Sequence, residues 1–141
     1  MNRRQARETL LALIYEADFG TDAENKLPDS HALYERAAEC REIEHDDYVE
    51  SVFFDIGAKL PEIDEKIFAH TNGWKADRLS RVSLSIMRLC VYELMFRDDV
   101  PYSVSLNEAV ELAKKFDHDK APKFINGVLN AIAEQEGLKT E

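Results

Sequence analysis

Three arginines near the start of the chain, Arg3, Arg4 and Arg7, are well suited to bind an anionic ligand. Positions three and four apart share one side of a helix, so we expect the three guanidinium groups to point the same way, off the apolar stripe. A guanidinium group donates paired hydrogen bonds to phosphate oxygens and can also stack on bases. The segment therefore indicates a site for nucleic-acid backbone, with a solvated, frayed N-terminus as the open alternative.

A second candidate site lies near the other end of the chain, at Lys120, Lys123 and Phe124. A loop lysine, a lysine at a helix start and an aromatic ring can together clamp a phosphate and stack one base. The alternative is that Phe124 faces the core, because Gly127 and Val128 follow it at helical spacing, and that both lysines are merely solvated. Both interpretations stay open.

The net charge of −10 taken alone argues against a nucleic-acid-binding protein. The charge is unevenly distributed, however. Residues 22–66 hold 14 of the 28 acidic residues against five Lys or Arg, whereas residues 1–7 hold three arginines and no acid. Positive charge is therefore scarce in this chain and locally concentrated at its start.

Signatures of catalysis are absent from the sequence. It contains no GxSxG, P-loop, GxGxxG or HExxH pattern, and its four histidines are scattered. The run from Glu44 to Asp47 holds ligand-type side chains, but sequence neighbours rarely converge on one ion, so we expect a helix cap there. We predict a binding protein rather than an enzyme, with no catalytic residues, no cofactor and no metal.

Cysteine usage and hydropathy favour a cytoplasmic protein. Cys40 and Cys90 show no CxxC spacing, which indicates reduced, structural thiols. No apolar run approaches the roughly 20 residues that span a bilayer. Arg7 and Glu8 interrupt any signal-peptide core at the N-terminus.

Hydrophobic periodicity predicts an all-α fold, a compact bundle of about six to seven helices in one domain spanning residues 1–141. The expected helices cover about 3–19, 30–43, 46–57, 61–68, 80–96, 105–116 and 122–137. Gly57 and Pro61 are expected to separate two of them, and Ser105 with Glu108 matches a capping box. Gly127 inside the last helix costs about 1 kcal/mol relative to alanine, which we attribute to close helix packing.

Four motifs in this order carry a family resemblance: RRxAR from Arg3, MRLxVYEL from Met87, VPYxVxxNEAVELAKxF from Val100 and KFxNGVL from Lys123. Together they resemble the NusB family of bacterial transcription antitermination factors. The resemblance spans roughly residues 3–19 and 74–132, and the segment between them is matched mainly by its helical character.

The resemblance implies a function and partners. NusB proteins pair with the small-subunit ribosomal protein NusE and bind boxA-type single-stranded RNA. The pair then joins other Nus factors and, indirectly, RNA polymerase on rRNA operons. No membrane partner is implied. By resemblance, RNA contacts fall on the N-terminal arginines and on the segment of Lys120, Lys123 and Phe124. Tyr15, beside the apolar stripe of the first helix, becomes a candidate contact for the protein partner.

Two other functions remain open at this stage. The acidity of residues 22–66 favours a purely protein-binding helical adaptor. The second alternative is a NusB-like RNA-binding module of the kind that is fused to rRNA cytosine methyltransferases. No methyltransferase domain follows within these 141 residues, so that function requires an enzyme acting in trans.

Overall fold

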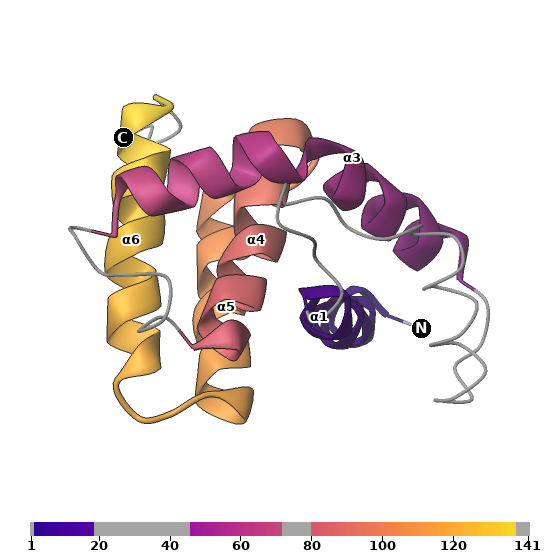
Figure 1. Cartoon of the computed structure of the whole chain (residues 1–141), viewed down its shortest axis with the longest axis horizontal. Helices are drawn as coiled ribbons and strands as arrows, with labels where there is room; N and C mark the ends of the chain where they lie inside the picture. The colour runs from indigo at the N-terminus through magenta and orange to yellow at the C-terminus, as the bar shows by residue number, and fades with distance from the viewer. Residues whose placement is uncertain (1, 19–45, 72–79, 138–141) are drawn as a thin grey trace. The chain divides into compact units, whose positions relative to one another are not determined.

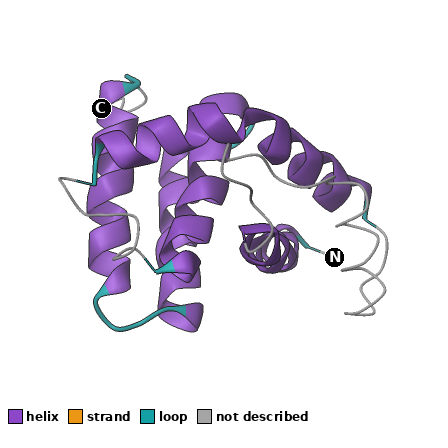
Figure 2. Cartoon of the chain, viewed as in Figure 1, coloured by secondary structure: helices purple, strands orange, loops and turns teal. Residues whose placement is uncertain are grey.

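The structure is a computed structural model that describes residues 2–18, 46–71 and 80–137. Within these residues every regular element is an α-helix and none is a strand (Figure 2), which confirms the all-α prediction. The helices are α1 (Arg3–Asp18), α3 (Asp47–Ala69), α4 (Arg81–Phe96), α5 (Tyr102–Phe116) and α6 (Ala121–Gln135), as labelled in Figure 1. The helix predicted at about 30–43 lies outside the described residues. No helix in the described ranges is long and apolar enough to cross a membrane.

Contacts group the chain into two compact units, residues 1–61 and residues 62–141. The first contains α1 and most of α3, and the second contains the last turns of α3 with α4, α5 and α6. The prediction of one domain over the whole chain stays a prediction.

The start of α1 is set by a reciprocal cap between Asn2 and Gln5. Asn2 Oδ1 accepts a hydrogen bond from the Gln5 backbone N–H at 2.8 Å, and Gln5 Oε1 accepts from the Asn2 backbone N–H at 2.9 Å. This arrangement satisfies two backbone donors that the first helical turn would otherwise leave unpaired. The cap therefore fixes the helix start directly beside the arginines.

Helix α3 is capped by Asp46, within the run from Glu44 to Asp47 where a cap was expected. The Asp46 Oδ1 accepts from the Val49 backbone N–H at 3.0 Å, so this carboxylate serves the helix start. The preceding Glu44 and His45 lie outside the described residues. Among the residues that are described, no three metal-ligating side chains come together.

The predicted break at Gly57 and Pro61 was wrong, because α3 continues through Pro61. Proline inside a helix costs about 3 kcal/mol, since it removes one backbone donor and crowds the carbonyl four residues earlier. Ile56, Leu60 and Ile63 continue one apolar stripe past this position and are at most 2% exposed. Burying such side chains contributes about 1.5–3 kcal/mol each, which offsets the cost. The boundary between the two units nevertheless falls directly after Pro61.

The core of the second unit is α4, in which every residue from Ser83 to Leu94 is buried. It packs against both α5 and α6, which also pack against each other, and the three helices run side by side in Figure 1. Ser80 caps α4 by accepting from the Ser83 backbone N–H at 2.9 Å. The predicted central helix is thus confirmed.

A buried ion pair ties the last turns of α3 to α4. The Arg88 guanidinium group donates from Nε to Asp64 Oδ1 and from Nη2 to Asp64 Oδ2, both at 2.9 Å. The two side chains are 3% and 5% exposed. A paired, two-bond geometry is what allows both charges to be buried.

The predicted capping box at Ser105 was wrong. Helix α5 begins three residues earlier, at Tyr102, with Pro101 as its cap residue. The Ser105 backbone N–H already bonds to the Pro101 carbonyl at 3.2 Å, so Ser105 lies inside the helix. Its hydroxyl donates instead to the buried carboxylate of Glu93 on α4, at 3.2 Å. A buried carboxylate needs a donor, and this tertiary contact takes the serine out of any capping role.

Cys90 is buried and does not form a disulfide, which fits the predicted structural role. Its Sγ lies 3.4 Å from the carbonyl oxygen of Ser105, on the neighbouring α5. Cys40 lies outside the described residues.

Candidate nucleic-acid interface

The first cationic group lies on the opening turns of α1. Arg3 and Arg4 are exposed, as predicted. The Arg3 guanidinium carbon lies 3.6 Å from the ring centroid of Tyr48, in the first turn of α3. Such a contact is electrostatically attractive and holds the guanidinium plane in one orientation. Arg3 and Tyr48 therefore present a charged group and an aromatic ring together.

Arg7 departs from the prediction that all three arginines point into solvent, because it is only 5% exposed. The reason is the width of the apolar face. Leu11, four residues on, is also buried and joins Leu10 and Ile14, so Arg7 lies within the buried side of the helix. Among the described residues no buried polar side-chain atom lacks a hydrogen-bond partner, so this guanidinium group is bonded within the protein.

The second cationic group surrounds the connection between α5 and α6. Lys120 and Lys123 are both exposed, and Phe124 is half-buried, between the two alternatives that the sequence left open. No side-chain hydrogen bond caps α6. The Ala121 backbone N–H bonds to the His118 carbonyl at 3.0 Å and Pro122 has no N–H, so the lysine side chains carry most of the positive charge here.

The end of α5 adds residues that the sequence analysis did not select. Lys114, Lys115 and Phe116 are all exposed, and Phe116 is 46% exposed. Lys115 Nζ lies 5.3 Å from the centroid of the Phe116 ring, while Lys114 pairs with Glu111 at 3.4 Å. A pair of lysines followed by an aromatic residue directly before a loop is the sequence signal that could have found them. We name the exposed set Lys114, Lys115, Phe116, Lys120 and Lys123 the α5–α6 corner.

Asp117 holds this corner to α4. Its carboxylate accepts from the Ser83 hydroxyl, from the Ser80 hydroxyl at 3.4 Å and from the His118 backbone N–H at 2.8 Å. The Asp117 side chain is 4% exposed. One of the two acidic residues of the loop is therefore turned inward, and its negative charge is screened from the surface by these donors. Asp119 remains exposed among the lysines.

Gly127 does not have the packing role that the sequence suggested. It is exposed, and a Cβ atom built on it would meet no atom of the described protein within 4 Å. The expectation of close helix packing was therefore wrong. The structure leaves a bare, solvent-facing stretch of backbone in the middle of α6, four residues after Lys123.

The predicted partner contact, Tyr15, is half-buried on α1. Part of its ring remains at the surface, so a contact with another protein stays a prediction. The structure brings Lys120, Lys123 and Phe124 together around the start of α6, whereas Arg3, Arg4 and Tyr15 belong to the first unit.

Comparison with known proteins identifies the family of this chain. The family model described as the NusB family matches residues 4–134. The transcription antitermination protein NusB of Natranaerobius thermophilus is 42% identical over 135 residues, which cover 96% of each chain. The NusB protein of Bacillus pumilus is 42% identical over 132 residues, 94% of this chain and 95% of that one.

Solved structures with the same fold include NusB from T. maritima, with a TM-score of 0.80 and 28% identity over 96% of this chain and 92% of that one. Another is a crystal structure of the antitermination factors NusB and NusE in complex with dsRNA. Its TM-score is 0.77 and its identity 29%, over 94% of this chain and 96% of that one. The family match and the two relatives in sequence extend over nearly the whole chain, and on this evidence the chain belongs to the NusB family of transcription antitermination proteins.

Proposed function

We propose that this protein is a transcription antitermination factor that binds boxA-type single-stranded RNA together with NusE and promotes processive transcription of rRNA operons. It acts by binding in the cytoplasm, and no bond is made or broken. Two findings support the proposal: membership of the NusB family, and the related complex of NusB and NusE with dsRNA.

The observation that carries the RNA-binding part is the exposed charge of the α5–α6 corner. Residues 114–124 hold four lysines against two aspartates in a chain whose net charge is −10. One of those aspartates is turned inward onto Ser80 and Ser83. An RNA phosphate approaching this corner would meet the exposed lysine ammonium groups, which favour an anion.

The N-terminal arginines supply the second part of the proposed RNA contact. Arg3 and Arg4 bind phosphates from the opening turn of α1, and Tyr48 offers a ring beside Arg3 on which a base can stack. Arg7 contributes by holding α1 in place, because its side chain is buried. Phe124 supports the corner from its half-buried position, and Tyr15 contacts NusE through the exposed part of its ring.

Fluorescence-anisotropy titration tests this proposal. A boxA-like RNA and a scrambled control are titrated with the protein, with and without the cognate NusE, at several salt concentrations. We expect tighter binding to boxA than to the control, and a further gain when NusE is added. Failure to bind either RNA in both conditions would leave a helical adaptor as the better description.

The salt dependence separates the cationic groups. Each RNA phosphate that the protein no longer neutralises should reduce the log–log salt slope by about 0.7 for a single strand. The double variant Lys120→Ala/Lys123→Ala is therefore expected to bind more weakly and with a shallower slope. Lys59→Ala is a matched control, since Lys59 lies on α3 and pairs with Asp55 at 2.6 Å. An unchanged slope in the double variant would refute the role of these two lysines.

A further inference from the structure

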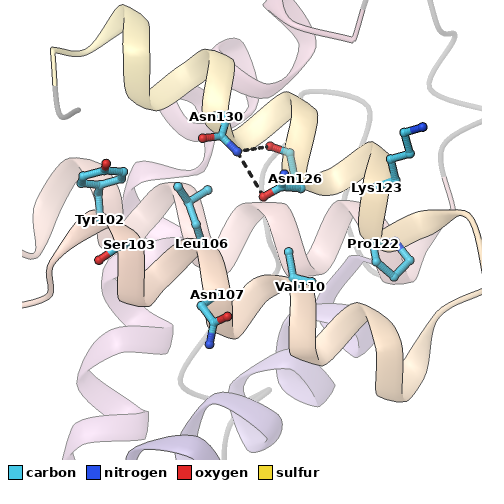
Figure 3. Close-up of a pocket in the computed structure, with 9 residues that line it drawn as sticks. All are labelled: Tyr102, Ser103, Leu106, Asn107, Val110, Pro122, Lys123, Asn126 and Asn130. Atoms are coloured by element: carbon cyan, nitrogen blue, oxygen red, sulfur yellow. Dashed lines mark hydrogen bonds between the residues drawn. The ribbon is translucent and has the colours of Figure 1, made fainter. Parts of the chain in front are cut away.

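A groove of about 490 Å³ lies between α5 and α6, next to the α5–α6 corner (Figure 3). Leu106, Val110 and Pro122 form its apolar part. Lys123 lies at one end and Tyr102 at the other, with the asparagines of α6 between them. Among the described residues that line the groove no side chain is acidic, although the chain has 28 acidic residues.

Two asparagines on α6 are oriented by hydrogen bonds to each other. Asn130 Nδ2 donates to the Asn126 carbonyl oxygen at 2.8 Å and to Asn126 Oδ1 at 3.1 Å, drawn as dashed lines in Figure 3. These bonds use both donors of the Asn130 amide. They leave Asn130 Oδ1 as an acceptor and Asn126 Nδ2 as a donor. A neighbouring donor and acceptor, held in place, match the hydrogen-bonding edge of a nucleobase.

The other residues of the groove fit the remaining parts of a nucleotide. Tyr102 is half-buried and offers a ring for stacking, while the apolar residues offer a surface for the base. Lys123 belongs both to the groove and to the α5–α6 corner, so a phosphate held at the corner would place its nucleoside toward the groove. From Pro122 to Asn130 the helix rises about 12 Å, which is room for a nucleoside and its phosphate.

The surface around the groove is open for a strand to enter and leave. Gly127, exposed and without contacts for a Cβ, leaves the backbone of α6 bare between Lys123 and Asn130. At the other end, Tyr102 also lines a second hollow of about 390 Å³, whose lining includes Asp98 and an Arg97 that pairs with Asp99 at 3.0 Å. An extended strand could therefore continue past the groove on both sides.

We propose that the groove between α5 and α6 holds one unpaired nucleotide of the bound RNA and reads its base through Asn126 and Asn130. This inference rests on the RNA binding proposed above. Lys123 binds the phosphate, Tyr102 stacks on the base, and the two amides donate to and accept from its edge. The groove thus selects a base at one position of the RNA, which phosphate contacts alone cannot do.

An abasic scan tests the inference. A series of boxA-like RNAs, each lacking the base at one position, is titrated against the protein with NusE present. For the wild-type protein we expect one position at which base removal weakens binding roughly tenfold, as stacking measurements suggest. In the variant Asn126→Ala/Asn130→Ala the penalty at that position should fall to the part that stacking on Tyr102 contributes, while penalties at other positions stay the same.

Two further variants serve as controls. Gln135→Ala removes an exposed amide from the same helix outside the groove and should leave the abasic profile unchanged. Tyr102→Phe should keep the stacking penalty and Tyr102→Leu should lose it. Circular dichroism spectra and melting temperatures establish that each variant is folded.

The outcomes are distinguishable. If the wild-type protein binds no RNA with NusE present, the proposed function fails and the inference with it. If RNA binds and the asparagine variant has the same abasic profile as the wild type, the function stands and the inference is overturned. The inference is equally overturned if the variant binds RNA normally but loses NusE, because the groove would then hold the protein partner.

Discussion

Helix α1 and the α5–α6 corner both concentrate positive charge on an acidic protein, but they use it differently. On α1, Arg7 is buried and Arg3 packs over Tyr48, so much of the charge takes part in contacts within the protein. At the corner, Lys120 and Lys123 are exposed, and the carboxylate of Asp117 is turned inward instead.

This difference separates two effects that a charge substitution can have. Removing a buried arginine leaves its bonded partners unsatisfied and disturbs the packing around its aliphatic part. Removing an exposed lysine changes the field at the surface and little else. We therefore expect substitution of the buried arginine of α1 to lower stability and RNA binding together. Substitutions of the corner lysines should lower RNA binding without lowering stability.

The largest expected loss of stability comes from removing the partner of the buried Arg88, and it gives the magnitude to expect for a buried arginine. Asp64→Ala leaves Arg88 buried without its carboxylate, and we expect the free energy of unfolding to fall by about 3–5 kcal/mol. Urea denaturation followed by circular dichroism measures this change. The exposed neighbour substitution Glu65→Ala should stay within about 0.5 kcal/mol of the wild type. A loss below about 1 kcal/mol for Asp64→Ala would mean that this pair is not the tie between α3 and α4 that its geometry suggests.

Arg7→Ala and Arg4→Ala test the comparison within α1. Because Arg7 is buried, its replacement should lower the free energy of unfolding by about 1–3 kcal/mol. Arg4 is exposed, so Arg4→Ala should leave stability within about 0.5 kcal/mol and reduce the salt slope of RNA binding by about 0.7. Urea denaturation and anisotropy titration of both variants provide the two readouts. Equal stability of the two variants would show that burial does not separate the roles of these two arginines.

Gly127→Ala tests whether stability and RNA binding can be separated on α6. The added methyl group meets open space and alanine has the higher helix propensity, so we expect stability to rise by about 0.5–1 kcal/mol. If the bare backbone is where RNA approaches, the same variant should bind boxA-like RNA more weakly. Thermal denaturation and anisotropy titration measure the two changes. A loss of stability would contradict the open surroundings of this glycine.

The smallest effect concerns Lys66, a lysine that forms an ion pair. Lys66 Nζ lies 2.6 Å from Glu136 Oε1, and this hydrogen bond, followed by attraction to the same carboxylate, raises the Lys66 pKa above its ordinary value of 10.5. The folded state thus holds this proton more tightly than the unfolded state does. The resulting stabilisation is present below pH 10.5 and is lost as the pH rises through the raised pKa.

Melting temperatures measured over a series of pH values test whether this stabilisation is lost as the pH rises. Above pH 10.5 the wild-type curve should fall more steeply than that of Glu136→Gln, in which the partner charge is absent. Glu134→Gln, an exposed change on the same helix, should follow the wild type. Parallel curves for all three proteins would show that the ion pair between Lys66 and Glu136 does not contribute to the stability of the folded state.

Local signals in the sequence were enough to place most helices. Asn2 marks the start of α1, Ser80 that of α4 and Pro122 that of α6, and each acts within its own first turn. A cap needs only the residues that follow it, so its effect can be read without the fold.

Features that depend on distant partners could not be predicted in this way. Ser105 reads as a cap until the buried Glu93, on another helix, is known to need its hydroxyl. The continuity of α3 through Pro61 depends on burial of the stripe on either side. The burial of Arg7 follows only when Leu11, four residues later, is included in the apolar face of α1.

The candidate site shows the same division. The sequence identified Lys120 and Lys123 from their residue types, but not Phe116 as an exposed ring or Asp117 as an inward-facing carboxylate. The exposure of Phe116 and the orientation of Asp117 depend on how α4 and α5 pack together. This packing cannot be predicted from the sequence of one segment. The groove between α5 and α6 was likewise invisible, since its lining is split between two helices.

The carboxylate of Asp117 has a consequence for how this part of the protein opens. It accepts from Ser80 and Ser83 at the start of α4 while its own backbone N–H closes the end of α5. These two helix ends therefore cannot fray independently. Their amide protons should exchange with solvent as one cooperative unit, and the loop that carries Lys120 should open with them. The corner then behaves as a rigid platform whose local unfolding is linked to that of the core helix.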